Sequence, residues 1–228
     1  MRWIILVLLF GIVGCGEGLQ PRLDSLLGTP IDRHQTDLLW PQLQRIGLVV
    51  HSDMTGSGAA PSIVQPFLDT LSRRTEEFII RRCGVASVVP IEFPASTQRD
   101  QIQKAFISRG QELGISHLLL VVLSSRERSG PVTLGEERMM TQMSGTVVEN
   151  TALAEVGLLR LADGVAIVNL PGSATEELEL LDVPIGASQP TRQESLEILR
   201  AQAGQQALDR SLNRLGLWCE STLEKDKT

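Results

Sequence analysis

Apolar runs and apolar helical stripes alternate through the first part of the chain after residue 45. Short apolar runs at 46–50 and 116–123, with a strand-like stretch at 85–93, indicate three strands. Between them, apolar side chains recur at helical spacing over 61–82 and 98–113. Gly84 and Gly114 follow these segments as expected helix ends, and Pro61 suits the first helical turn. The pattern predicts β-α-β-α-β, an order that favours a sheet with helices packed against it.

The later pattern predicts a hairpin and a long helix. Residues 151–161 and 165–170 are apolar-rich, and Ala162-Asp163-Gly164 between them is typical of a tight β-turn. Pro171-Gly172 is expected to end or bend the second of these strands. Thr191 to Glu194 form a capping box, after which an amphipathic helix should continue to about residue 216.

The predicted fold class is therefore α/β (α+β), a mixed β-sheet with flanking helices in the order β-α-β-α-β-(loop)-β-β-α. Residues 46–218 are expected to form a single domain, followed by a polar tail at 219–228. Two long connections remain, 124–150 and 172–190. The first is expected to be either a further hairpin that extends the sheet or an exposed contact loop containing Met139, Met140 and Met143.

The amino terminus has the features of an export signal. Met1-Arg2 is basic, and Trp3 to Val13 is an apolar run about half as long as the roughly 20 residues that cross a bilayer as a helix. The sequence Ile12-Val13-Gly14-Cys15 resembles the lipobox of bacterial lipoproteins, in which the cysteine is acylated and becomes the first residue after cleavage. The alternative is an ordinary secretory signal with a coincidental cysteine.

This resemblance implies a signal peptide at 1–14, lipidation at Cys15 and a lipidated tether at 15–45 that partly packs on the domain. Such a tether would reach at most about 100 Å if fully extended. Gly16 stands where many diderm bacteria use Asp to retain a lipoprotein in the inner membrane. The resemblance therefore implies a lipid-anchored protein of the cell envelope, on the periplasmic face of the outer membrane.

Composition and charge narrow the classes of function. The chain has 42% hydrophobic and 21% charged residues, which is typical of a globular protein rather than a disordered or multi-span membrane protein. Its formal net charge is −6. Phosphate backbones need a concentrated basic surface, so a general nucleic-acid partner is not expected.

Three local features resemble one group of envelope proteins. These are the strand Ile46 to Val50 with the loop and helix after it, the helix-to-strand join 110–119 and the hairpin 159–164. They resemble the α/β domain of the curli-secretion lipoprotein CsgG, the penicillin-binding-protein activator LpoB and the amino-terminal domain of TolB, over roughly 45–217. The resemblance implies a periplasmic interaction domain without catalysis. A curli-type pore is not implied, because 124–150 is too charged for lipid-facing strands.

Cys83 and Cys219 both follow predicted helices, and export would place them where disulfides form. A bridge would contribute about 5 kcal/mol in the chain-entropy model. Two buried free thiols are the equally weighted alternative.

No other pattern defines an established kind of active site. His34, His51 and His117 lack metal-ligand spacing, and no Gly-x-Ser-x-Gly elbow is present. A loop comprising Gly56, Ser57 and Gly58, between a strand and a helix, could offer backbone amides to an anion, although a plain turn is favoured. The acidic residues at 176–182 do not match an EF-hand, and a solvated loop is favoured over calcium binding.

The first hypothesis is a non-enzymatic envelope lipoprotein whose domain binds another, unidentified envelope protein in assembly, secretion or cell-wall synthesis. No cofactor and no metal are expected, the membrane is contacted through the lipid, and self-association is left open. The second hypothesis is a small-ligand or anion-binding lipoprotein, and a hydrolase comes third. An exposed apolar patch near Met139 to Met143 would favour the first, and a concave pocket near Ser57 the second.

Overall fold

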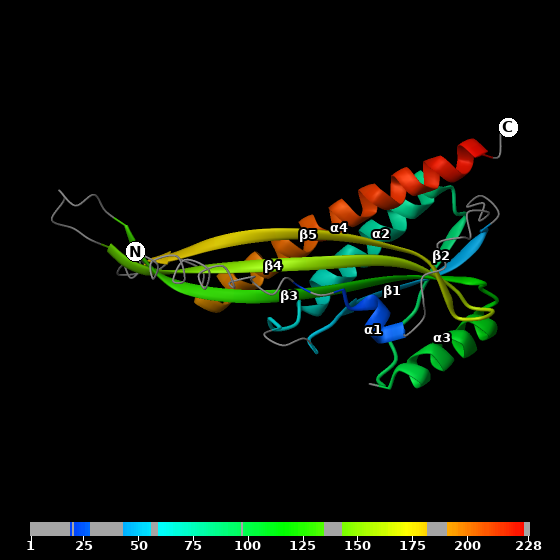
Figure 1. The fold of residues 1–228 in the computed structure, drawn as a ribbon, viewed down its shortest axis with the longest axis horizontal. Helices are drawn as coiled ribbons and strands as arrows, with labels where there is room; N and C mark the ends of the chain where they lie inside the picture. The colour runs from blue at the N-terminus through cyan, green and yellow to red at the C-terminus, as the bar shows by residue number, and fades with distance from the viewer. Residues whose placement is uncertain are drawn as a thin grey trace, which may run out of the picture.

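The computed structural model describes residues 19, 21–27, 43–55, 59–96, 98–134, 143–181 and 191–225 (Figure 1). In chain order, the elements are α1 (Leu23–Leu27), β1 (Arg45–Ser52), α2 (Gln65–Cys83), β2 (Ser87–Pro90), α3 (Arg99–Leu113), β3 (His117–Leu134), β4 (Met143–Arg160), β5 (Val165–Leu181) and α4 (Arg192–Lys225). The five strands form one sheet in the order β2-β1-β3-β4-β5. β1 is parallel to β2 and β3, whereas β3, β4 and β5 are antiparallel to their neighbours. The predicted α/β fold class is thus confirmed.

Helices cover both faces of the sheet. α2 and α4 lie on one face, and α1 and α3 lie on the other (Figure 1). Leu119 and Val121 of β3 pack in the core beneath α2 and α4, while Leu118 and Leu120 pack with α1 and α3. Because both faces of this strand are buried, its sequence is a continuous apolar run rather than an alternating one.

The helix ends mostly follow the local signals. Gly84 and Gly114 take left-handed φ values of 74° and 63° directly after α2 and α3. Before α4, the Thr191 Oγ1 accepts the Glu194 N–H at 3.2 Å, and the Thr191 N–H donates to the Glu194 carboxylate at 2.7 Å. This is the predicted capping box. α2, however, begins at Gln65 rather than at 61, so that Pro66 occupies its first turn, where no N–H is needed.

β3, β4 and β5 are longer than predicted, whereas β2 is shorter, at Ser87–Pro90 instead of 85–93. β3 continues to Leu134 and pairs with β4 from Ser124↔Leu153 to Leu134↔Met143, so the first long connection is largely the hairpin alternative. Of the end or bend expected at Pro171-Gly172, the strand end is wrong, because β5 runs through both residues to Leu181. Proline is tolerated because β5 is the last strand of the sheet. At Gly172, the backbone of α4 passes so closely that a Cβ would collide with the Ala207 carbonyl.

The acidic residues from Glu176 onward therefore belong mainly to a strand instead of a loop. Glu176, Glu177 and Glu179 all lie in β5 and pair with β4, whereas Asp182 lies outside the described residues. The predicted hairpin turn is present at 161–164, with Gly164 at φ 71°.

The predicted polar tail at 219–228 is wrong over its described part. α4 does not end at Gly216 but continues to Lys225, and Cys219 and Thr222 are buried. Gly216 packs against the Phe78 ring, where a Cβ would lie only 3.1 Å from that ring. The apolar contacts of α4 thus extend beyond the glycine, which explains why the helix continues. None of the described helices is both long enough and apolar enough to cross a membrane.

Candidate functional site

Several predicted site residues lie outside the part of the chain that the structure describes. These are the lipidation residue Cys15, the loop residues Gly56, Ser57 and Gly58, the residues Met139 and Met140, and His34. α2 begins seven residues beyond Gly58, so the helix does not follow that loop directly. One premise of the anion hypothesis, an adjacent helix amino terminus, is therefore wrong.

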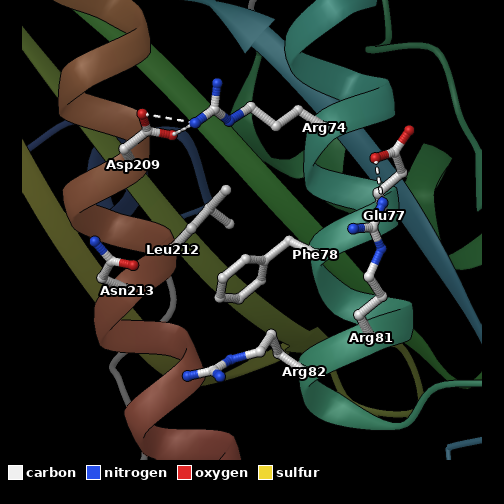
Figure 2. Close-up of a pocket in the computed structure, with 8 residues that line it drawn as sticks. All are labelled: Arg74, Glu77, Phe78, Arg81, Arg82, Asp209, Leu212 and Asn213. Atoms are coloured by element: carbon white, nitrogen blue, oxygen red, sulfur yellow. Dashed lines mark hydrogen bonds and ion pairs between the residues drawn. The ribbon is translucent and has the colours of Figure 1, made fainter.

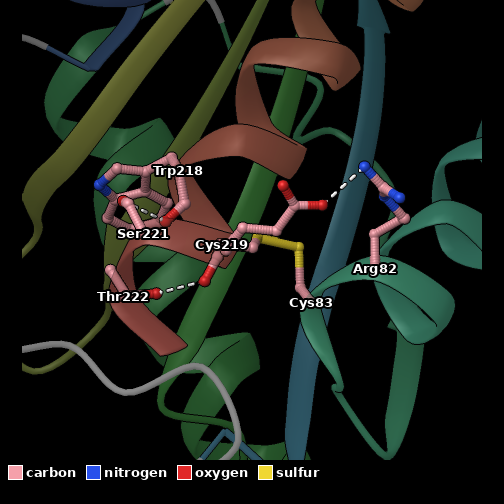
Figure 3. The surroundings of a disulfide bond; sticks show 7 residues. Arg82, Cys83, Trp218, Cys219, Ser221 and Thr222 are labelled. Atoms are coloured by element: carbon pink, nitrogen blue, oxygen red, sulfur yellow. Dashed lines mark hydrogen bonds and ion pairs between the residues drawn. A yellow bond between two sulfur atoms is a disulfide. The ribbon is translucent and has the colours of Figure 1, made fainter. Parts of the chain in front are cut away.

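Cys83 and Cys219 form a disulfide in the structure (Figure 3), with an S–S distance of 2.04 Å and a Cα–Cα distance of 5.2 Å. Cys83 is the last residue of α2, and both side chains are fully buried. Just outside the bridge, Arg82 and Glu220 form an ion pair at 2.7 Å whose side chains are 55% and 47% exposed. The disulfide ties α2 to α4 at one end of their shared layer.

A groove of about 440 Å³ lies between α2 and α4 (Figure 2). The ring of Phe78 points from α2 into this groove toward α4, where Leu212 forms the apolar part of the opposite wall. Arg74 closes one end by an ion pair with Asp209 at 2.8 Å. Burial raises the pKa of the Asp209 carboxyl, and the charge of Arg74 offsets part of this effect. The groove offers an apolar floor with guanidinium donors around it.

A second crevice, of about 800 Å³, lies at the carboxyl ends of β1 and β2. The pairing of β2 with β1 ends at Leu48↔Pro90, so Val50 and Ser52 have no described strand on that side. Side chains at the amino end of α2 form the opposite wall of the crevice. Residues that follow β2 complete the lining. The lining polar side chains are His51, Ser52, Ser62, Gln65, Asp69, Ser72 and Glu92.

The electrostatics of this crevice do not suit an anion. Asp69 and Glu92 contribute two carboxylates, and no arginine or lysine of the described residues lines the crevice. His51 stacks on Phe93 with ring centroids 3.7 Å apart. Burial lowers the pKa of His51, although the nearby Asp53 carboxylate offsets part of that effect. The two carboxylates, with no described basic side chain in the lining to balance them, favour a cationic or hydroxyl-rich ligand over a phosphate.

A third site holds the amino-terminal segment on the sheet. Glu155 of β4 is fully buried, and its carboxylate accepts hydrogen bonds from the backbone N–H groups of Arg22 and Leu23, the latter at 3.1 Å. The side-chain amide of Asn169 donates to the same carboxylate at 3.0 Å. The Arg22 guanidinium also contacts Asp53 at 2.6 Å. These contacts fasten the start of α1 to β4 and to the end of β1.

Asp53 is buried and strongly bound in this site. Burial alone would raise the pKa of its carboxyl. Hydrogen bonds from Arg22 and Thr55, with the positive charge of Arg22, outweigh that effect and lower the pKa below its ordinary value. This pairing has no local signal in the sequence, because Arg22 and Asp53 are separated by 31 positions.

The remaining histidine of the described chain, His117, starts β3. Its Nδ1 contacts the Ser116 hydroxyl at 2.8 Å, and its buried Nε2 has no hydrogen-bond partner in the structure. Burial, followed by the charge of Arg160, lowers the pKa of His117, and Asp163 opposes the shift. Within the described ranges, no group of three or more His, Cys, Asp or Glu side chains is placed to hold a metal ion.

Comparison with known proteins finds structural similarity but no sequence match. No protein-family model and no curated protein sequence matches the chain. A structure described as a neuraminyllactose-binding hemagglutinin homolog from Helicobacter pylori is 8% identical, with a TM-score of 0.46, over 81% of this chain and 91% of that one. Lipoprotein GNA1162 from Neisseria meningitidis is 13% identical, with a TM-score of 0.28, over 71% and 95%.

Rare lipoprotein B from Shewanella oneidensis is 16% identical, with a TM-score of 0.29, over 78% of this chain and 98% of that one. Two of these three structures are thus bacterial lipoproteins, and the likeness spans most of each chain. The values are too low to carry residues or a function to this protein. The narrower resemblance to the CsgG, LpoB and TolB domains stays a prediction.

Proposed function

We propose that the chain is a non-enzymatic lipoprotein of the cell envelope, anchored through Cys15 at the periplasmic face of the outer membrane. Its α/β domain binds another envelope protein during assembly, secretion or cell-wall synthesis. The observation that supports this function best is the groove between α2 and α4, which presents an aromatic ring at the surface of an otherwise packed helical layer.

The groove has the chemistry of a protein-binding site. Phe78 is only half-buried although Leu212 beside it is 2% exposed, so the ring retains apolar surface that a partner side chain can cover. Aromatic residues, phenylalanine among them, and arginine are enriched at protein–protein interfaces. In the ion pair of Arg74 with Asp209, the two side chains are 47% and 32% exposed, respectively. Exposed pairs of this kind are weak, about 0–1 kcal/mol, so a partner can replace them at small cost.

The proposal is tested by site-specific photo-crosslinking in cells that produce the full-length protein. A photoreactive amino acid replaces Asn213, which is exposed in the groove, or Lys104, which is exposed on α3 across the sheet. We expect a reproducible adduct with one envelope protein from position 213 and not from position 104. Equal adducts from both positions, or none from position 213, would contradict docking through the groove.

The lipid anchor has its own test. Mass spectrometry of the mature amino terminus should find a diacylated or triacylated cysteine at position 15. A chain that starts at any other residue, or an unmodified cysteine there, contradicts the anchor. Separation of the two membranes on a density gradient then distinguishes the outer from the inner membrane.

A small-ligand lipoprotein is the second candidate, because the crevice beside Val50 and Ser52 lies where open parallel sheets bind ligands. The two carboxylates there favour a cation, whereas the predicted anion-binding loop at 56–58 lies outside the described residues and stays a prediction. Thermal denaturation with 1,4-diaminobutane and with inorganic phosphate compares the two charges. Stabilisation by the diamine that is lost in Glu92→Gln would support this candidate, while no shift with either probe would leave protein docking as the function.

A further inference from the structure

The docking of α1 on the sheet restricts how the domain can be oriented at its membrane. We propose that α1 moors the domain with its α1–α3 face toward the anchoring membrane and its α2–α4 groove toward the aqueous side. This inference rests on the proposed lipid attachment at Cys15. The inference also predicts that the partner protein approaches the groove from the side away from the anchoring membrane.

The contacts of α1 are those of a docked element. Leu23 and Leu27 are 1% and 3% exposed and pack in the core formed with α3. The Leu23 side chain fills the space above Gly157 of β4, where a Cβ would collide with it. From α3, the Arg99 guanidinium donates to the Ser25 carbonyl at 3.0 and 3.1 Å.

Charge reinforces this docking at the start of the helix. A buried carboxylate is costly unless hydrogen bonds satisfy it. Among the described residues, two of the three hydrogen-bond donors to Glu155 are the backbone N–H groups of Arg22 and Leu23. Undocking would leave this carboxylate without those donors. It would also separate Arg22 from the buried Asp53. Each loss opposes release of α1, and together they make the docked state the stable one.

The docking shortens the connection to the lipid. Cys15 and Arg22 are seven residues apart, which allows at most about 23 Å when extended. A tether that ran freely to residue 45 would allow about 100 Å. The mooring site is the place where Arg22 and Leu23 contact Glu155 and Gly157. It lies on the face that α1 shares with α3, and the sheet separates it from α2 and α4 (Figure 1). To bring the groove to the membrane, the short connection would have to pass around the sheet and a helix layer about 10 Å thick.

The orientation is measured on the purified, lipidated full-length mature protein in vesicles of phosphatidylethanolamine and phosphatidylglycerol. A fluorophore is attached through Lys104→Cys on α3 or Asn213→Cys in the groove, and spin-labelled lipids act as quenchers. The native Cys83 and Cys219 are joined and buried, so they do not compete for the label. We expect stronger quenching at position 104 than at 213. Equal quenching, or stronger quenching at 213, overturns the orientation.

Spacer insertions test the mooring itself. A Gly/Ser spacer of about ten residues adds roughly 17 Å of mean reach. Placed between Cys15 and Pro21, it should abolish the quenching at position 104. Placed between Leu27 and Leu43, it should leave that quenching unchanged, because α1 stays docked. A freely running tether predicts the same loss from both insertions, and that result would overturn the proposal.

A double variant separates the docking contacts from the spacer effect. Glu155→Gln with Asp53→Asn weakens the contacts that hold α1. In this variant, the spacer between Leu27 and Leu43 should reduce quenching at position 104 as the spacer between Cys15 and Pro21 does. Flotation with the vesicles is checked in every sample. Failure to float overturns the lipid anchor and this inference together, whereas flotation with equal effects of both spacers overturns the mooring alone.

Discussion

The carboxylate of Glu155 accepts the backbone N–H of Leu23 at 3.1 Å, across 132 positions of the chain. A buried side chain from the middle of a long strand thereby acts as the cap of a five-residue helix. So short a helix has almost no stability of its own. The order of α1 therefore depends on the sheet, and disturbing the docking site should release it without unfolding the domain.

Gly157 offers the sharpest steric test of this docking. In Gly157→Ala, the new methyl group collides with Leu23, and we expect the unfolding free energy to fall by about 1–3 kcal/mol. Hydrogen exchange should show lost protection at 22–27 while α4 keeps its own. Gly130→Ala on β3 is the matched control, since a Cβ there has no neighbour within 4 Å. Equal effects of the two substitutions would refute the steric account.

Asp53 makes the docking sensitive to acid. Because its pKa is lowered in the folded protein, its contribution to stability is present above the ordinary carboxyl pKa of about 3.9 and is lost as the pH falls through the lower, folded value. Asp53→Asn should therefore be less stable than the wild type near neutral pH, and the difference should shrink as the pH falls below the ordinary carboxyl pKa. Urea unfolding across this range measures it.

The exposed Glu177→Gln on β5 controls for the removal of one carboxylate from the surface. It should show no comparable loss near neutral pH. A constant difference between wild type and Asp53→Asn at every pH would mean that packing, rather than charge, accounts for the effect of the substitution.

The sequence predicts the helices and the buried strands because their signals are local. Gly84 and Gly114 end helices through their own backbone conformation, and the apolar run of β3 lies entirely between two covering layers. The outer halves of β3 and β5 carry no such run. Beyond Ser125, β3 is paired through backbone hydrogen bonds but carries Arg126, Glu127 and Arg128, so no apolar alternation marks it as a strand.

The candidate sites were harder to predict for a different reason. The groove needs Phe78 and Leu212 from two helices separated by most of the chain, and the mooring site joins Arg22 to Glu155. One local signal was available: Glu155 is the only charged residue between Thr151 and Leu159, and a glycine follows it two positions later. A carboxylate at such a buried position needs donors, and the glycine makes room for the segment that provides them.

Phe78 should matter for binding more than for folding. Its ring is only partly buried, so Phe78→Ala should lower the unfolding free energy by less than the roughly 3–5 kcal/mol typical of a fully buried phenylalanine. The photo-crosslinked adduct from position 213 should disappear in this variant. Ile80→Ala, on the same helix at a residue 39% exposed and outside the groove lining, should retain it. Loss of the adduct in both variants would argue for a general effect on α2.

The disulfide joins α2 to α4, and its removal should lower the unfolding free energy. Cys83 and Cys219 are 136 positions apart, and a bridge over that length stabilises by about 5 kcal/mol in the chain-entropy model. Urea unfolding of the exported protein should therefore shift to lower urea when a reductant is present. Cys83→Ala with Cys219→Ala should unfold at low urea with or without it. Alkylation of the denatured, unreduced protein should find neither thiol at these positions, and finding both would show that the bridge does not form in the envelope.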